Sequence, residues 1–375
     1  MATKRKLKLK SPIIGILKVI GILLLIVLGC FIFYRKQIND LKKIGYSELA
    51  SKNILLKWKK EDVLEIGKNK TLNIAFESEA YKEKYFDSYS KIKYKDSKYL
   101  IENINALIKK GYNNEQITMI LYHGSGEDVR KFAKRDKVRY LEEFYTTDYA
   151  KIKYYDRYVK YMDESREDEE TSILLVNLDM DKEEYEDPIA VKDFSYDMLV
   201  NKHRKLEEKF QPSNLVKINK EDASAEGMKA NRTAYVAFKQ MKKQAESEGY
   251  HLVINSAYRD YDDQTEIMET YRKLYGDAYV EKYVLKPGFS EHQTGLAFDI
   301  GSTDTKVFAN SDEYTWIVDN CYKFGFIYRF KKEYEDITGI RHEAWHYRYV
   351  GRKIAKEIYD KRLSYEEYYA MHIEK

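Results

Sequence analysis

The chain has 375 residues, of which 34% are charged, and its formal net charge is only +4. This near balance of charge makes no case for a nucleic-acid partner, and we expect none. The only two cysteines are Cys30 and Cys321, which lie too far apart in the expected topology to pair, so the chain is not a disulfide scaffold. The length allows one core-bearing domain with accessory parts.

The N-terminus predicts a membrane anchor. Residues 1–11 form a basic tail without acidic residues, and residues 12–34 are apolar except for Lys18. The apolar run has the length of about 20 residues that spans a bilayer. No small-residue cleavage site follows it, so we expect an uncleaved helix rather than a signal peptide. The positive tail predicts a cytoplasmic N-terminus, which places the rest of the chain outside the cell.

Residues 35–98 and 99–170 carry an internal repeat. Nine residues recur 66 positions later: Leu41, Lys43, Gly45, Tyr46, Ile54, Leu55, Glu61, Asp62 and Val63 match Leu107, Lys109, Gly111, Tyr112, Ile120, Leu121, Glu127, Asp128 and Val129. Farther on, residues 84–87 resemble residues 153–156 after an insertion of three residues. The apolar spacing in each copy is helical. We therefore expect two small helical modules in tandem.

Residues 171–375 predict an α+β domain, with helices packed on a small antiparallel sheet. The acidic stretch 163–170 is typical of a solvated linker or helix end, and the apolar segment 172–177 predicts a strand after it. Within the domain we expect helices over 227–248, 263–275, 313–324 and 352–359, and strands over 251–255, 296–300, 327–330 and 345–350.

Two segments about fifty residues apart carry candidate metal ligands. The first contains His292 and Asp299, separated by seven residues, which excludes neighbouring positions on one helix face. The second contains Glu343 and His346 in a β-prone aromatic run. Three ligands together with a carboxylate that is not a ligand are the pattern of a zinc hydrolase. We assign zinc to His292, Asp299 and His346, and the role of general base to Glu343.

A chance occurrence explains these two segments less well than a metal site does. A single His-to-Asp spacing of this kind is common by chance, and a histidine beside an aromatic residue is more often packed than a ligand. However, the chain has only seven histidines, and two of them fall in these two segments. The second segment also places an acid three residues before its histidine. The pair of segments therefore favours a metal site.

The two segments resemble the SxHxxGxAxD and ExWH signatures of the VanY-type D-alanyl-D-alanine carboxypeptidases, which are related to VanX dipeptidases and LdcB-type L,D-carboxypeptidases. Upstream, Ser256-Ala257-Tyr258-Arg259 followed by Gln264, and Pro287-Gly288-Phe289-Ser290, are also similar to family segments. The resemblance covers about residues 185–375. It departs from the family pattern at Ala344, where proline is expected, and this change removes no ligand.

The resemblance implies the same zinc ligands and the same base. It adds Arg259, whose guanidinium would steady an oxyanion or hold a substrate carboxylate. The alternative for Arg259 is a surface salt bridge with Asp260 or Asp262. The resemblance also suggests hydrogen bonds to the peptide substrate, and the residues concerned are Ser256, Tyr258, Gln264 and Ser290. Their alternative is the ordinary role of polar groups at turns and strand ends.

The expected protein is a membrane-anchored zinc D,D-carboxypeptidase that removes the terminal D-alanine from peptidoglycan stem peptides outside the cell. An L,D-carboxypeptidase, a D,D-dipeptidase or an endopeptidase would share the motif residues and stays open. A non-catalytic wall-binding scaffold is a further alternative, although a structural zinc site needs no base such as Glu343. The helical modules would either bind the wall or serve as a spacer above the membrane.

Overall fold

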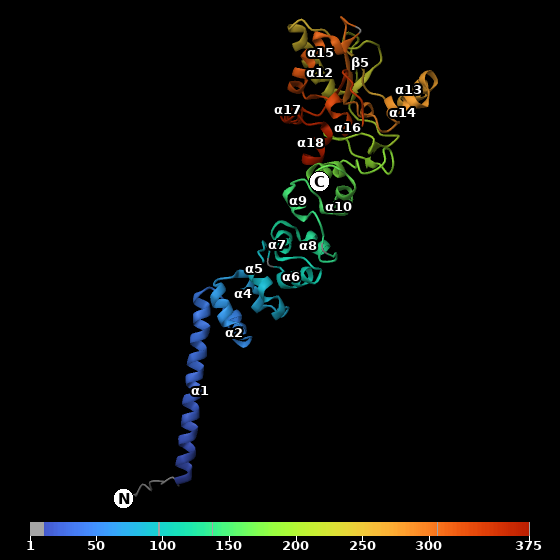
Figure 1. Cartoon of the computed structure of the whole chain (residues 1–375). Coiled ribbons are helices and arrows are strands. Elements are labelled where there is room, and N and C mark those ends of the chain that lie inside the picture. Colours follow the sequence, from blue (N-terminus) through green and yellow to red (C-terminus); the bar gives the residue numbers. More distant parts are fainter. Residues whose placement is uncertain (1–10, 97, 137, 306, 375) are drawn as a thin grey trace. The chain divides into compact units, whose positions relative to one another are not determined.

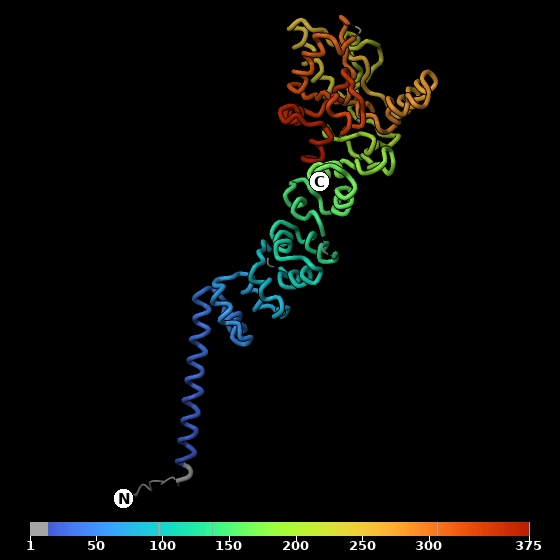
Figure 2. The backbone as a smooth tube through the Cα atoms, viewed as in Figure 1, coloured from blue at the N-terminus to red at the C-terminus, as the bar shows by residue number. Residues whose placement is uncertain are grey.

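The computed structural model describes residues 11–374 apart from positions 97, 137 and 306. The basic tail, residues 1–11, therefore lies outside the described residues apart from Ser11. The described residues form two compact units, one ending at Tyr145 and the other beginning at Thr146. Figure 2 follows the backbone through both units.

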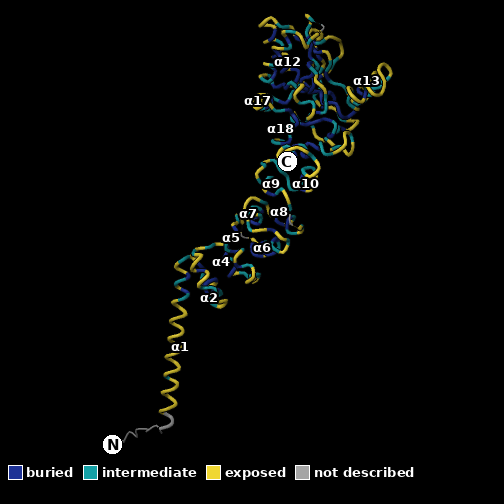
Figure 3. Tube along the Cα trace, in the orientation of Figure 1, coloured by how far each residue is buried: buried dark blue, intermediate teal, exposed yellow. Residues whose placement is uncertain are grey.

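The first unit begins with the long apolar helix α1 (Ser11–Lys43). Residues Ile14–Lys43 of this helix are long and apolar enough to cross a membrane, with a mean hydropathy of 3.0 in the most apolar window. Its side chains are exposed along most of its length, as Figure 3 shows. Near its end, Ile38 and Leu41 are buried, and α1 packs there on α2 (Glu48–Leu56). The apolar span is thus a single helix, whose orientation in a membrane stays a prediction.

Helices fill the two repeat regions. The first region holds α2, α3 (Lys60–Ile66), α4 (Lys70–Glu77), the 3-10 turn η1 (Glu83–Tyr85) and α5 (Phe86–Lys91). The second holds α6 (Leu100–Lys109), α7 (Asn114–His123), α8 (Gly126–Phe132), α9 (Leu141–Thr146), η2 (Ile152–Tyr154) and α10 (Tyr155–Glu164). The pairs α2 and α7, and α3 and α8, begin 66 residues apart, at 48 and 114 and at 60 and 126. The pairs η1 and η2, and α5 and α10, begin 69 residues apart, at 83 and 152 and at 86 and 155.

Each repeat region holds a buried tyrosine at a matching position, Tyr89 and Tyr158, and each tyrosine pairs with an asparagine in the segment that follows its region. Tyr89 Oη donates a hydrogen bond to Asn105 Oδ1 at 2.5 Å, and Tyr158 Oη donates to Asn177 Oδ1 at the same distance. In each pair the asparagine amide donates to a backbone carbonyl, of Ala80 at 2.7 Å and of Tyr149 at 3.0 Å. A buried polar pair that satisfies itself in this way specifies one packing arrangement.

The expectation of a strand over 172–177 was wrong, because these residues lie in helix α11 (Glu169–Asn177). Asp168 caps the helix by accepting a hydrogen bond from the Thr171 backbone N–H, and two glutamates occupy the first turn, where a negative charge favours a helix. A short apolar run fits a buried strand or a buried helix equally well. Here Leu174 and Leu178 pack on Ala370 of the C-terminal helix α18 (Tyr365–His372). The second unit, which begins at Thr146, contains this helix together with residues 146–170.

The second unit is built on a four-stranded antiparallel sheet, as the α+β prediction expects. Its strands β5 (Leu252–Ser256), β6 (Ala297–Ser302), β8 (His346–Tyr349) and β7 (Phe326–Tyr328) lie in this order. Two short pairs flank it, β1 (Ile189–Val191) with β2 (Arg204–Leu206), and β3 (Leu215–Lys217) with β4 (Lys229–Asn231). Besides α10 and α11, the helices of this unit are α12 (Arg232–Ser247), α13 (Tyr261–Tyr275), α14 (Asp277–Tyr283), α15 (Asp312–Asn320), α16 (Glu335–Thr338), α17 (Arg352–Lys361) and α18.

The main core lies between α12 and the sheet. The Phe298 ring of β6 lies 6.0 Å from the Phe238 ring of α12 and 5.5 Å from the Phe326 ring of β7, and all three side chains are fully buried. Helix α12 starts at Arg232, later than predicted, because residues 229–231 pair in β4 and Asn231 caps the helix by accepting from two backbone N–H groups. This core fixes the position of β6, which carries Asp299.

The paired asparagines give a test of the repeat. We expect Asn105→Leu and Asn177→Leu each to lower the local free energy of opening by about 1–3 kcal/mol, because each leaves a buried tyrosine hydroxyl without its acceptor. Amide hydrogen exchange of residues 36–375 measures this for each helix separately. The half-buried Asn103→Leu in α6 is the control and should change little. A loss of stability from only one of the two substitutions would contradict a shared module.

Candidate metal centre

Three neighbouring strands bring polar side chains into one row across the sheet. Ser256 on β5 pairs with Asp299 on β6, and Asp299 pairs with His346 on β8. Residues directly opposite in an antiparallel pair point to the same face. The register of β5 shifts between Ile254 and Ser256, and such a bulge re-aims the side chain that follows it. Strand pairing alone therefore places two candidate ligands side by side.

The third ligand comes from the turn before β6. His292 lies in the 3-10 turn η4 (Glu291–Thr294), where Ser290 Oγ accepts from the His292 backbone N–H at 3.4 Å. The turn ends at Gly295, which has φ +69°. A Cβ at this position would lie 2.9 Å from the Leu215 side chain, so both the backbone and the space require glycine. The predicted turn thus directs His292 back towards the strand that follows.

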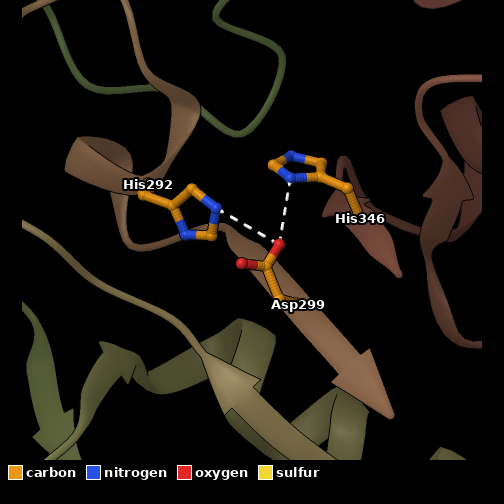
Figure 4. Close-up of side chains that lie close together, drawn as sticks. All are labelled: His292, Asp299 and His346. Carbon is orange, nitrogen blue, oxygen red and sulfur yellow. Dashed lines mark ion pairs between the residues drawn. The ribbon is translucent and has the colours of Figure 1, made fainter. Parts of the chain in front are cut away.

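The three predicted ligands converge on one point, as Figure 4 shows. Asp299 Oδ1 lies 3.4 Å from His292 Nε2 and 3.2 Å from His346 Nδ1. Tetrahedral zinc with bonds of about 2.0 Å holds its ligand atoms roughly 3.3 Å apart. Asp299 Oδ1 is also buried and accepts no hydrogen bond, which is the state of an atom reserved for a cation. The donor set and its spacing fit a zinc ion.

The second nitrogen of each imidazole is fixed by a hydrogen bond. His292 Nδ1 donates to the Ala257 carbonyl at 2.6 Å, and His346 Nε2 donates to Glu291 Oε2 at 3.3 Å. Each bond fixes the orientation of its ring, so that the other nitrogen faces Asp299. One ring therefore presents Nε2 and the other Nδ1 to the metal position.

Glu291 belongs to a buried charge network that the sequence did not reveal. Arg329 Nε donates to Glu291 Oε1 at 2.9 Å, and a terminal nitrogen of Arg329 donates to Glu366 Oε2 on α18 at 2.8 Å. Burial alone would raise the pKa of Glu291, but the charges of Arg329, Arg348 and His346 hold that pKa well below its usual range. Glu291 therefore stays a carboxylate. Its position inside the first motif was the one available signal, since its partners are remote in sequence.

Glu343 lies beside the ligand cluster without joining it. Its Oε2 is 3.6 Å from His346 Nδ1, and its backbone N–H donates to the Phe330 carbonyl at 3.0 Å. Burial raises the pKa of Glu343 to about 7, so its carboxylate can gain and lose a proton near neutral pH. The structure thus places Glu343 beside the candidate ligands, and its role as a base stays a prediction.

The histidines differ in their charge state. Burial and the charge of Arg259 lower the pKa of His292 to about 4. Burial also acts to lower the pKa of His346, but the adjacent carboxylates of Asp299 and Glu291 favour the protonated ring, outweigh burial and raise that pKa to about 9. In the metal-free protein His292 is therefore neutral at pH 7, whereas His346 carries a proton that a metal must displace.

Arg259 points into the site instead of pairing with its sequence neighbours Asp260 or Asp262. One terminal nitrogen donates to Ser256 Oγ at 2.7 Å and lies 3.8 Å from Asp299 Oδ2. Its Nε donates to Gln264 Oε1 at 3.2 Å. Burial lowers the pKa of the Arg259 guanidinium, although the group keeps its charge at physiological pH. A cation that is held in this way beside a metal position suits a carboxylate or an oxyanion.

A cleft of about 710 Å³ contains the candidate site. The residues that line it include the three ligands, Glu343, Arg259, Ser256, Gln264 and Ser290. Gln264 and Ser290 are buried, and both side chains already make internal hydrogen bonds. Tyr258 is half-buried and does not line the cleft, so its predicted contact with substrate gains no geometric support. Tyr271, Tyr279 and Tyr283 line the cleft as well, and sequence reasoning did not identify them.

Comparison with known families agrees with this geometry. A family model named VanY and described as D-alanyl-D-alanine carboxypeptidase matches residues 227–352, which contain all three ligands and Glu343. This part of the chain belongs to the VanY family. The match begins just before α12 and ends at the start of α17, so it includes the whole four-stranded sheet of the VanY domain.

Individual relatives match the VanY domain and its surroundings. The putative carboxypeptidase YodJ of Bacillus subtilis is 41% identical over 179 residues, which are 46% of this chain and 66% of that protein. A D-alanyl-D-alanine carboxypeptidase of Enterococcus faecalis is 39% identical over 133 residues, 33% of this chain and 49% of that protein. The chain thus spans about half to two thirds of the length of these curated relatives.

Solved structures are also similar. The LdcB LD-carboxypeptidase structure is 41% identical, with a TM-score of 0.43 over 46% of this chain and 85% of that chain. A variant of the vancomycin resistance D,D-pentapeptidase VanY in complex with Zn(II) is 31% identical, with a TM-score of 0.41 over 46% of this chain and 98% of that chain.

Replacement of Glu291 tests the role of the buried network. We expect Glu291→Gln to weaken zinc binding about 10- to 100-fold, because His346 loses the charged acceptor that orients its ring. The variant should also unfold more easily by about 3–5 kcal/mol, since Arg329 loses one of its buried partners. Competition with a chromogenic chelator measures the zinc affinity. Glu313→Gln, a buried glutamate in α15 outside the cleft, is the control, and equal affinities would contradict the assignment.

The charge state of His346 gives a second prediction. At pH 8 the binding of one zinc ion should release close to one proton, because the pKa of His346 is raised to about 9 whereas that of His292 is lowered to about 4. Zinc affinity should therefore fall about tenfold per pH unit below pH 8 and level off above about pH 10. Calorimetric titration in buffers of different ionisation enthalpy counts the protons, and a count of zero would refute this charge state.

Proposed function

We propose that this chain is a membrane-anchored zinc D,D-carboxypeptidase that removes the C-terminal D-alanine from peptidoglycan stem peptides outside the cell. The observation that carries the proposal is a carboxylate, Glu343, within 3.6 Å of a candidate ligand and inside the same cleft as Arg259. A site that served only stability would need neither a base nor a substrate-binding cation.

The residues divide the chemistry among themselves. A bound zinc ion would polarise the scissile carbonyl and make water more acidic. Glu343 takes the proton of the attacking water and returns it to the leaving amine, a task suited to a pKa of about 7. Arg259, held by Ser256 and Gln264, binds the terminal carboxylate of the peptide or the charge that develops on the carbonyl oxygen. Ser290 stays in place as the cap of the ligand turn.

The preference for a terminal D-alanine rests on relatives. The D-alanyl-D-alanine carboxypeptidases of Enterococcus faecalis and Enterococcus faecium are 39% and 33% identical to the matched part of this chain. A bifunctional D-Ala-D-Ala dipeptidase and carboxypeptidase of Enterococcus gallinarum, 35% identical over 119 residues, supports the dipeptidase as the second candidate. Both candidates share the residues described above, and only the products separate them.

The N-terminal parts would place this activity at the wall. Helix α1 supports an anchor in the cytoplasmic membrane with the basic tail inside the cell and the VanY domain outside. The repeated element order and the repeated tyrosine–asparagine pair support two copies of one helical module after it. We propose that these modules set the distance between the anchor and the VanY domain.

Mass spectrometry of muropeptides tests the activity. Incubation of residues 36–375 with zinc should remove one alanine from pentapeptide, and a chelator should abolish the reaction. Glu343→Gln should lower kcat by at least 100-fold while zinc content stays unchanged, since the carboxylate is the proton acceptor and not a ligand.

Other products of the same experiment would identify a different activity. Loss of alanine from tetrapeptide alone would identify an L,D-carboxypeptidase, and release of a dipeptide would identify a D,D-dipeptidase. Full activity of Glu343→Gln would refute the assigned mechanism. The absence of turnover on every stem peptide by zinc-loaded protein would support the scaffold alternative.

A further inference from the structure

Helices α13 and α14 form a hairpin that stands out from the sheet (Figure 1). Of the fifteen residues of α13 only Gln264 is buried, and of the seven of α14 only Val280. Helices of this length are marginal in water unless one face packs against a core. Leu274, at 66% exposed, shows that the hairpin leaves apolar surface in solvent. Burial in the core therefore does not explain this segment.

Four tyrosines of the hairpin form what we call the tyrosine ladder: Tyr271, Tyr275, Tyr279 and Tyr283. Ring centroids of successive members lie 5.8, 4.6 and 4.7 Å apart, and the rings of Tyr271 and Tyr279 are nearly parallel. Tyr275 is 59% exposed and Tyr283 is 47% exposed. A row of exposed aromatic rings that support each other is a typical mark of a binding surface.

The tyrosine ladder is continuous with the candidate metal centre. Tyr271, Tyr279 and Tyr283 line the same cleft as the three ligands and Glu343. The base of the hairpin is also tied to the site, since Gln264 Nε2 donates to the Leu285 carbonyl at 2.8 Å while its Oε1 accepts from Arg259. A molecule whose end lies at Arg259 would therefore leave the cleft along the ladder.

We infer that the tyrosine ladder binds the pyranose rings of the glycan strand to which the stem peptide is attached, an inference that rests on the proposed function. A pyranose ring has an apolar C–H face and a rim of hydroxyl groups. Tyrosine offers a matching flat apolar face and a polar tip, and it loses little conformational entropy on binding. Arg341 and Lys282, whose cations lie 5.8 and 5.4 Å from the centre of the Tyr283 ring, line the same cleft and add hydrogen-bond donors beside the ladder.

Binding to glycan without peptide tests the ladder separately from catalysis. The full chain in detergent is titrated calorimetrically with soluble amino-sugar glycan oligomers from which the stem peptides have been removed. We expect saturable binding that weakens about fivefold or more in Tyr275→Ala, because one ring contact is lost. Tyr275→Phe keeps the ring and should bind like the wild type. No binding, or equal binding by Tyr275→Ala, would overturn the inference.

Tyr359 provides the matched control. It is also an exposed helical tyrosine, at 41%, stacked on Tyr322 at 3.9 Å, but it lies on α17 and does not line the cleft. Tyr359→Ala should bind the glycan as the wild type does. Zinc content equal to that of the wild type shows that each variant keeps an intact metal centre.

Kinetics then show whether the ladder serves the metal centre. The wild type should cleave a disaccharide-linked pentapeptide with a higher kcat/KM than the free pentapeptide, and Tyr275→Ala should reduce this preference about fivefold. A preference that is absent, or that survives in Tyr275→Ala, would contradict the link between ladder and site. Failure to cleave either peptide would refute the proposed function, whereas the glycan titration would still decide the ladder.

Discussion

The hydrogen bond between the Glu291 carboxylate and the His346 ring is the interaction on which the rest of the site depends. This bond selects the ring nitrogen that faces Asp299. The same Glu291 carboxylate is one of the two acidic partners of buried Arg329, and Glu366 is the other. Removing one member of such a network leaves an uncompensated charge in a low-dielectric interior, which costs far more than a surface contact. The charges thus hold one geometry, and through Glu366 they hold the C-terminal helix against the site.

A polar site of this kind needs a rigid frame. The apolar cluster around Phe298 fixes β6 from one side, so that neighbouring strands deliver Ser256, Asp299 and His346 in a single row. The hairpin of α13 and α14 has no comparable core beneath it. Segments with few buried residues open at a low free-energy cost. The elements that move around active sites are usually segments of this kind. The second unit therefore combines a fixed centre with a loosely supported rim.

The sequence singled out His292, Asp299, His346 and Glu343 because each motif is local and chemically distinctive, and the structure brings these side chains together. It predicted the sheet strands for a similar reason, since alternation and aromatic content are readable within a few residues. It missed Glu291 and Arg329 as partners, because they are 38 residues apart and meet only through the tertiary fold. The segment 172–177 was misread as a strand because a short buried apolar run fits either structure. The tyrosine ladder was missed because tyrosine is abundant along the whole chain.

Asp299 and His346 are directly opposite each other on β6 and β8. The metal site therefore forms only when these two strands pair in the correct register. A slip of one residue would turn His346 to the opposite face of the sheet and destroy the ligand set. A chain that had folded with the wrong alignment would thus gain nothing from the ion, whereas the correct alignment would be stabilised by its full binding free energy. The availability of the metal would then select correctly aligned chains among those newly folded.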